Sequence, residues 1–155
     1  MRINGEYVVK GDRELVFALL QDPIFLAKAI PGAERLEQVG EHLYEATIRA
    51  GVGPVRGTFT GTVQISEQRP PEFYRLTLQG NGAAGFVRGT GTVTLVEVPE
   101  GTKILYEGET QIGGRIAQVG QRLVQSVARK MINDGLRTLE AEVQQRTGRS
   151  DTRSK

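Results

Sequence analysis

The last third of the chain has the hydrophobic pattern of one long amphipathic helix, which we expect to span Gly114–Gln145. Apolar side chains recur three or four positions apart, with arginine, glutamine and asparagine between them. These apolar residues are Ile116, Val119, Leu123, Val127, Met131, Ile132, Leu136, Leu139 and Val143. Such a stripe indicates a helix that buries one face. At 1.5 Å per residue the helix would be roughly 50 Å long, so it needs a long apolar groove.

The sequence before this helix alternates between apolar and polar positions, which is typical of half-buried strands. Gly- and Pro-rich turns separate the expected strands. We expect strands at 3–9, 35–39, 43–50, 55–65, 74–80, 87–95 and 102–112. Asp12 should cap a short helix that ends near Leu20, and a second short helix should cover 24–30. This order predicts an α+β fold in which a curved antiparallel sheet wraps around the C-terminal helix.

Five glycines fall on the strand face that the alternation turns inward. They are Gly57, Gly61, Gly89, Gly91 and Gly108. Glycine weakens a strand, so each needs a reason: bending of the sheet, close approach of the long helix, or space for a ligand. Bending or helix contact is the simpler explanation for any one glycine. Several on one concave face favour a cavity.

Charge and composition limit the chemistry of the chain. Residues 146–155 hold four of the 20 basic and one of the 18 acidic side chains, which leaves 16 basic and 17 acidic ones, a net charge of −1, in residues 1–145. We therefore expect one domain at 1–145 and a disordered basic tail at 146–155, and we do not expect nucleic-acid binding. The chain has no cysteine and one histidine, His42, so we expect no metal site. Without a signal peptide or a membrane-spanning run, we expect a cytoplasmic protein that contacts at most the inner face of the membrane.

Four segments resemble those of a known family. They are 22–23 with 30–34 (DP and IPGAE), 53–61 (GPVRGTFTG), 102–106 (TKILY) and 113–123 (GGRIAQVGQRL). In this order they resemble the CoxG family of carbon monoxide dehydrogenase subunits, which belongs to the START-like (SRPBCC) superfamily, over about residues 3–143. The resemblance implies a helix-grip fold with an apolar cavity between sheet and helix. It also implies a role beside molybdenum hydroxylases of the carbon monoxide dehydrogenase type, in attaching the enzyme to the membrane and handling a lipophilic molecule such as a quinone.

We expect the cavity wall to come from inward positions of the strands and from the start of the long helix. The candidates are Tyr44, Ile48, Phe59, Leu76, Leu78, Val93, Tyr106, Ile116, Val119 and Leu123. A quinone or isoprenoid needs mostly apolar contact and one or two hydrogen bonds, which tyrosine hydroxyls can provide. Our first hypothesis is therefore a non-enzymatic carrier or accessory protein without a resident cofactor, whose partners are an apolar small molecule and a molybdenum hydroxylase. A homodimer is compatible with this hypothesis.

Two alternatives stay open. The first is a small START-like cyclase or hydrolase, which would use an inward tyrosine (Tyr44, Tyr74 or Tyr106). It would also need a buried carboxylate of raised pKa, Glu107 or Glu109. The alternation of the strand, however, favours a solvent-exposed position for both glutamates. A protein–protein adaptor with a filled core would instead anchor a dehydrogenase to the membrane through its surface.

Two apolar segments, 24–26 and 83–86, lie beside flexible sequence. They can form a mouth that contacts a membrane or a partner. The simpler explanation is that Phe25 and Phe86 pack under the rim of the sheet.

Overall fold

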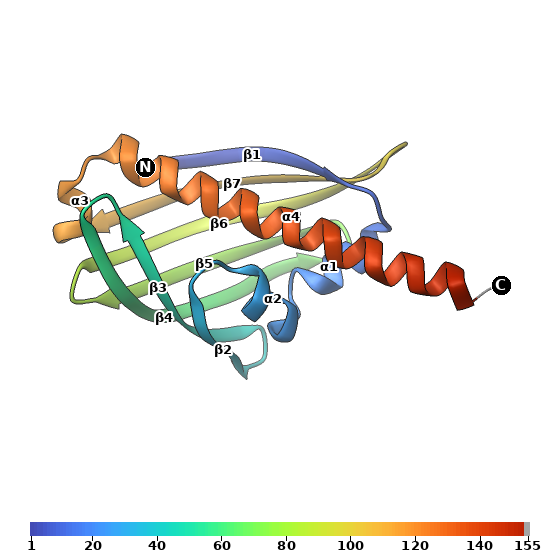
Figure 1. Cartoon of the computed structure of the whole chain (residues 1–155), viewed down its shortest axis with the longest axis horizontal. Coiled ribbons are helices and arrows are strands. Elements are labelled where there is room, and N and C mark those ends of the chain that lie inside the picture. The colour runs from blue at the N-terminus through green and yellow to red at the C-terminus, as the bar shows by residue number, and fades with distance from the viewer. Residues whose placement is uncertain (154–155) are drawn as a thin grey trace.

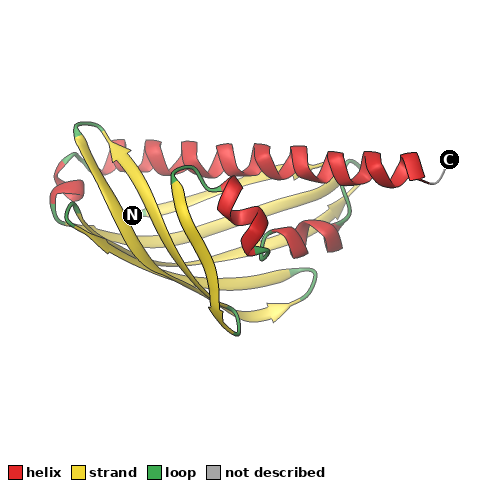
Figure 2. Ribbon diagram, turned by 60° about the horizontal axis from the view of Figure 1, so that its bottom comes forward, coloured by secondary structure: helices red, strands yellow, loops and turns green. Residues whose placement is uncertain are grey.

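The computed structural model describes the backbone of residues 1–153 and the side chains of residues 1–147. Its seven strands form one antiparallel sheet in the order β1-β7-β6-β5-β4-β3-β2. The strands are β1 Arg2–Val9, β2 Ala33–Gly40, β3 Leu43–Val52, β4 Val55–Arg69, β5 Phe73–Gly82, β6 Gly85–Val98 and β7 Gly101–Gly113. The helices are α1 Arg13–Leu19, α2 Pro23–Ala29, α3 Arg115–Gln118 and α4 Gln121–Arg153. The predicted α+β helix-grip fold is confirmed: the curved sheet forms a cup, and α4 runs along its open side (Figures 1 and 2).

The curvature of the sheet explains most of the inward glycines. A Cβ atom on Gly61 would collide with the carbonyl oxygen of Gln79 on β5, and one on Gly89 would lie 2.7 Å from the carbonyl oxygen of Glu109 on β7. For all five glycines the nearest atoms belong to the strands or to the β5–β6 turn, and none of these atoms belongs to α4. Of the two simpler explanations, bending of the sheet with close approach of its strands accounts for these glycines, and contact with the long helix does not.

The two short helices lie where they were predicted, but their capping differs. Asp12 precedes α1 without a side-chain cap hydrogen bond, so the predicted cap is wrong. Asp22 caps α2 instead: its Oδ1 accepts a hydrogen bond from the backbone N–H of Ile24 at 2.9 Å, and Pro23 occupies the first helical position.

The long C-terminal helix is interrupted near its start. The sequence predicts one helix over 114–145, whereas the structure has the short α3 and then α4, with Gly120 between them at φ 101°. This positive φ favours glycine, and it turns the chain so that α3 closes the end of the sheet while α4 crosses it. Helix α4 is continuous to Arg153, so residue 145 is not its end. Residues 154–155 lie outside the described residues, and the disordered tail stays a prediction.

Buried apolar side chains form two separate cores. The main core joins α1, α2 and the second half of α4 to the sheet, and includes Val16, Phe25, Leu139 and Val143. The second, which we call the α3-end core, contains Val52, Ile116 and Val124, with five half-buried side chains packed against it. The separation leaves the middle of the inner sheet face outside both cores.

Candidate ligand site

Glycines occupy the inner sheet face between the two cores. The strand register places Leu76 of β5 opposite Gly91 of β6, and Gly91 opposite Gly108 of β7. In the next row, Leu78 pairs with Gly89. Because side chains on one sheet face come only from such rows, the inner face is backbone at Gly89, Gly91 and Gly108, with Leu76 and Leu78 beside it on β5.

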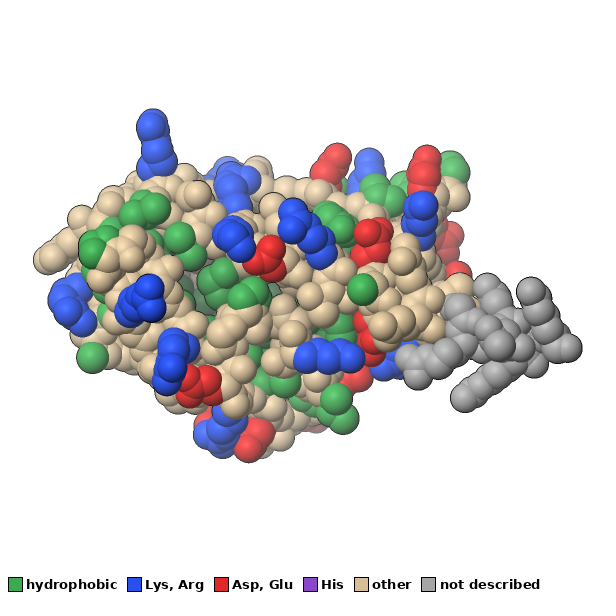
Figure 3. All heavy atoms as spheres, viewed as in Figure 1, with side chains coloured by type: hydrophobic (Ala, Val, Ile, Leu, Met, Phe, Trp, Pro, Cys, Tyr) green, Lys and Arg blue, Asp and Glu red, His purple; other side chains and the backbone are tan. Residues whose placement is uncertain are grey.

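One half-buried apolar side chain, Leu78, stands beside this glycine floor as the cross-strand neighbour of Gly89. Ile48 on β3 and Met131 on α4 are also of intermediate exposure and, like Leu78, belong to neither core. Figure 3 shows a hollow on one face of the molecule, beside the long helix on its β3–β4 side, with hydrophobic side chains in its wall. We call the glycine floor, with Leu78 beside it, the central recess. It is an apolar site with a backbone floor.

A row of large side chains closes the recess on the main-core side. Tyr74, Val93 and Tyr106 are direct cross-strand neighbours on β5, β6 and β7. With strands about 4.8 Å apart, the two tyrosines lie about 10 Å from each other across the sheet. The ring of Tyr106 extends over Gly5 of β1, which has no side chain to block it. Tyrosines therefore border the recess at one end.

The hydroxyl groups of the inward tyrosines differ in their partners. Tyr44 donates a hydrogen bond to the backbone oxygen of Gln21 at 2.6 Å, so its only donor is used. The hydroxyls of Tyr74 and Tyr106 make no hydrogen bond to the residues whose side chains the structure describes. Burial, and then the neighbouring Tyr44, raise the pKa of Tyr74, which keeps its hydroxyl protonated. Tyr74 and Tyr106 thus keep a donor that no described residue uses, Tyr74 in the main core and Tyr106 over Gly5 of β1.

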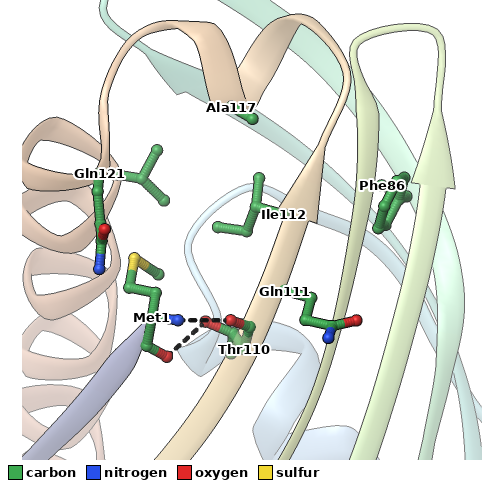
Figure 4. Close-up of a pocket in the computed structure, with 8 residues that line it drawn as sticks. Met1, Phe86, Thr110, Gln111, Ile112, Ala117 and Gln121 are labelled. Carbon is green, nitrogen blue, oxygen red and sulfur yellow. Dashed lines mark hydrogen bonds between the residues drawn. The ribbon is translucent and has the colours of Figure 1, made fainter.

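A pocket of about 530 Å³ lies between β7, α3 and the start of α4 (Figure 4). Its wall includes Met1, Thr110, Ile112, Gln121 and Val124. Thr110 is the cross-strand neighbour of Gly89, so the pocket begins beside the glycine floor. These residues were not predicted from the sequence because the pocket exists only where α3 and α4 separate. The glycine in the middle of the helical pattern, at position 120, was the available signal.

The structure divides the ten predicted lining residues between the two ends of the recess. On the main-core side lie Tyr44, Leu76, Val93 and Tyr106, and on the α3 side lie Phe59, Ile116 and Val119. Ile48 and Leu78 lie between them, in neither core. Leu123 is 38% exposed and contacts the β3–β4 turn, where a Cβ on Gly53 would lie 2.9 Å from its Cδ2. The ten residues therefore do not form one continuous wall, and their role in lining a ligand site stays a prediction.

The two candidate catalytic glutamates lie outside the recess. Glu107 and Glu109 are on the outer sheet face, with side chains 58% and 66% exposed. Glu107 pairs with Arg2, with a nitrogen–oxygen distance of 3.6 Å. Alternation predicted this exposure, and neither carboxylate is buried as the cyclase alternative requires. Within the described residues, no group of His, Cys, Asp or Glu side chains could hold a metal ion.

The two apolar segments behave differently. Phe25 is 2% exposed and packs in the main core, as the simpler explanation predicted, whereas its neighbour Ile24 is 80% exposed. Phe86 is half-buried, and the guanidinium carbon of Arg88 lies 4.7 Å from the centre of its ring. Among the described helices, none is both long and apolar enough to span a bilayer.

A curved antiparallel sheet that holds a long C-terminal helix over an apolar recess defines this protein as a START-like, helix-grip domain. A START superfamily protein from Mycobacterium smegmatis is 10% identical, with 93% of this chain and 97% of that chain covered and a TM-score of 0.68. The Zhui aromatase/cyclase from a Streptomyces species is 14% identical, with 95% of both chains covered and a TM-score of 0.69. At these identities the likeness shows the fold alone.

The family follows from the sequence. The model of the CoxG family of carbon monoxide dehydrogenase subunits matches residues 5–144, and the chain therefore belongs to this family. A conserved protein from Geobacillus kaustophilus is 32% identical, with 94% of this chain and 96% of that chain covered and a TM-score of 0.88. No curated protein matches the chain. Family and fold together support a ligand-binding role.

Proposed function

We propose that this protein is a non-enzymatic carrier that binds a lipophilic molecule, a quinone or an isoprenoid, in the central recess. We propose further that it serves a membrane-linked molybdenum hydroxylase of the carbon monoxide dehydrogenase type. The observation that carries the proposal is the backbone floor formed by Gly89, Gly91 and Gly108 between two separate cores. A flat apolar molecule can lie on such a floor, where side chains would otherwise fill the space.

The hydroxyls of Tyr74 and Tyr106 support a quinone in particular. A quinone offers two carbonyl oxygens as hydrogen-bond acceptors at opposite ends of a flat ring. Each tyrosine has one donor that no described residue uses, and both residues belong to the row of the sheet next to the glycine floor. One neutral hydrogen bond contributes about 0.5–1.5 kcal/mol, which corresponds to about a two- to twelvefold change in affinity.

The first test is mass spectrometry of an organic extract of the protein after purification under non-denaturing conditions, before and after incubation with quinone-containing membranes. The proposal predicts a stoichiometric quinone or isoprenoid. Its reproducible absence after loading would refute the carrier function and leave the adaptor as the better explanation. Turnover of the bound molecule would refute the non-enzymatic role.

Gly80→Leu tests the location of the ligand. A Cβ on Gly80 would make only ordinary contacts, 3.9 Å from Phe59 Cβ and 3.9 Å from Thr60 O, and it would project from the inner sheet face next to Leu78. Ligand loading should fall strongly while the melting temperature is kept. Gly40→Leu, at the end of β2, is the matched control and should load normally. Equal loading of both variants would place the ligand elsewhere.

Tyr106→Phe tests the hydrogen bond, with Tyr44→Phe as its matched control. Tyr106→Phe should weaken quinone binding by about two- to twelvefold, whereas Tyr44→Phe removes a hydroxyl whose proton is already given to Gln21. The readout is a titration with a short-chain quinone. A larger effect of Tyr44→Phe on affinity would contradict the assignment of the donors.

A further inference from the structure

Charged residues are unevenly distributed over the strands and helices. Segments 46–66, 73–96 and 110–133 contain no aspartate or glutamate. Their charged residues are Arg49, Arg56, Arg75, Arg88, Arg115, Arg122, Arg129 and Lys130. The net charge of −1 over residues 1–145 conceals this pattern, because the acidic residues lie in the remaining segments.

The three segments meet at one end of the molecule. A Cβ on Gly57 would lie 2.9 Å from Ala84 Cβ in the β5–β6 turn, and the backbone N–H of Ile116 donates to the oxygen of Ala84 at 2.9 Å. Gly53 in the β3–β4 turn contacts Leu123 on α4. The two turns, α3 and the first turn of α4 therefore form one surface, which we call the α3 end (Figure 1).

Four arginines of the α3 end have no acidic partner. Arg56, Arg88, Arg115 and Arg122 are exposed, and none of them forms an ion pair with the residues whose side chains the structure describes. By contrast, Arg49 pairs with Glu34, with a nitrogen–oxygen distance of 3.0 Å. Figure 3 shows basic side chains around hydrophobic ones at this end of the molecule. An unpaired cationic surface of this kind attracts an anionic partner.

Small apolar groups lie between these arginines. Pro54, Ala83, Ala117 and Leu123 are all exposed, and they come from the two turns, α3 and α4. Apolar tips surrounded by basic side chains are typical of surfaces that enter the headgroup region of a bilayer, where arginine binds phosphate and the apolar groups leave water. Ala117 also lines the pocket of about 530 Å³, so the pocket opens at this surface.

We propose that the α3 end docks on a bilayer that contains anionic phospholipid, with the pocket facing the lipid. This inference rests on the proposed carrier function, because a lipophile dissolved in the membrane must be exchanged there. The sequence-based expectation was a mouth formed by segments 24–26 and 83–86. The second segment contains the β5–β6 turn and belongs to the α3 end, whereas Ile24 lies on α2 and is not part of it.

The test is co-sedimentation of the full chain with vesicles of phosphatidylcholine, alone or mixed with phosphatidylglycerol. The wild type should bind only the anionic vesicles, and more weakly at high salt. Each arginine near an anionic surface contributes about a fivefold factor, so the double variant Arg115→Gln/Arg122→Gln should bind about 25-fold more weakly. The matched double variant Lys10→Gln/Arg69→Gln removes the same charge at the opposite ends of β1 and β4 and should bind nearly as the wild type does.

Three results would overturn the proposal: no binding to anionic vesicles, equal loss in the two double variants, or loss in Ile24→Gln but not in Arg115→Gln/Arg122→Gln. Retention on an acidic protein or on nucleic acid, without vesicle binding, would also overturn it. A titration of each variant with a short-chain quinone, in the absence of membranes, distinguishes failure of this proposal from failure of the carrier function. The arginine variant should keep quinone affinity, and Gly80→Leu should keep vesicle binding while it loses quinone.

Discussion

Leu139 and Leu123 occupy the same apolar stripe in the sequence, but the structure gives them different environments. Leu139 is fully buried in the main core, whereas Leu123 is 38% exposed at the start of α4. Replacing each by alanine removes the same atoms from the same helix. The difference between the two variants therefore measures how firmly each half of α4 is packed.

The expected magnitudes follow from burial. Leu139→Ala loses about 2.4 kcal/mol of transfer free energy at about 0.8 kcal/mol per buried methylene, and a residual cavity raises the cost to about 3–4 kcal/mol. Leu123→Ala should cost about 1 kcal/mol, because part of its surface is already in water. At roughly 2–4 °C per kcal/mol, the melting temperature should fall by roughly 6–16 °C for Leu139→Ala and by under about 4 °C for Leu123→Ala.

The assay is urea unfolding at neutral pH, monitored by fluorescence and circular dichroism. The free energy of unfolding of each variant is compared with that of the wild type. Equal losses for the two variants would show that the start of α4 packs as firmly as its second half, and would refute the open recess. A loss under about 1 kcal/mol for Leu139→Ala would show that the main core does not hold the helix as described.

Two further predictions concern the glycine before α4 and a carboxylate in its second half. Gly120→Ala should lower the free energy of unfolding by about 1–3 kcal/mol, because φ is 101° and no atom lies within 4 Å, so that the cost is backbone strain alone; unchanged urea unfolding would contradict it. Glu142 accepts hydrogen bonds from Lys28 at 3.2 Å and Arg146 at 3.3 Å, which hold the pKa of its carboxyl below the usual value. This contribution is present above the unfolded-state pKa and is lost as pH falls through the lower folded-state pKa. In urea unfolding, the free energy of unfolding of Glu142→Gln should therefore be lower than that of the wild type at pH near 7 and nearly equal to it at a pH of about 3. The same difference in free energy at both pH values would refute the argument.

The fold was predictable because its signals are local. Strand alternation assigned Tyr44, Ile48 and Leu76 to the inner face, and the structure places them there. The break at Gly120 was not predictable in the same way. A glycine inside a helical pattern costs only about 1 kcal/mol relative to alanine, so the apolar stripe argues for a continuous helix through it. What the stripe does not show is the long-range contact of α3, in which the backbone N–H of Ile116 donates to the oxygen of Ala84 in the β5–β6 turn.

The site was less predictable because it depends on long-range register and charge. Alternation shows that Gly91 and Gly108 face inward, but only the pairing of β6 with β7 places them side by side. The donor of Tyr44 is used by Gln21, which lies 23 positions away in the sequence. Likewise, a net charge summed over the domain carries no information on which arginines lack partners at the α3 end.

The two cores separate stability from binding. Most fully buried side chains, among them Leu19, Leu95 and Leu139, belong to the main core, where α1, α2 and the second half of α4 pack on the sheet. The glycine floor contributes little apolar burial, so the sheet can keep an unfilled face there without losing its main stabilisation. A lipophile bound on that floor would supply the missing contacts and stabilise the folded state by mass action. The main core therefore provides a rigid frame, and under the proposed carrier function the α3 end, with its smaller core and unpaired arginines, would be where a ligand enters.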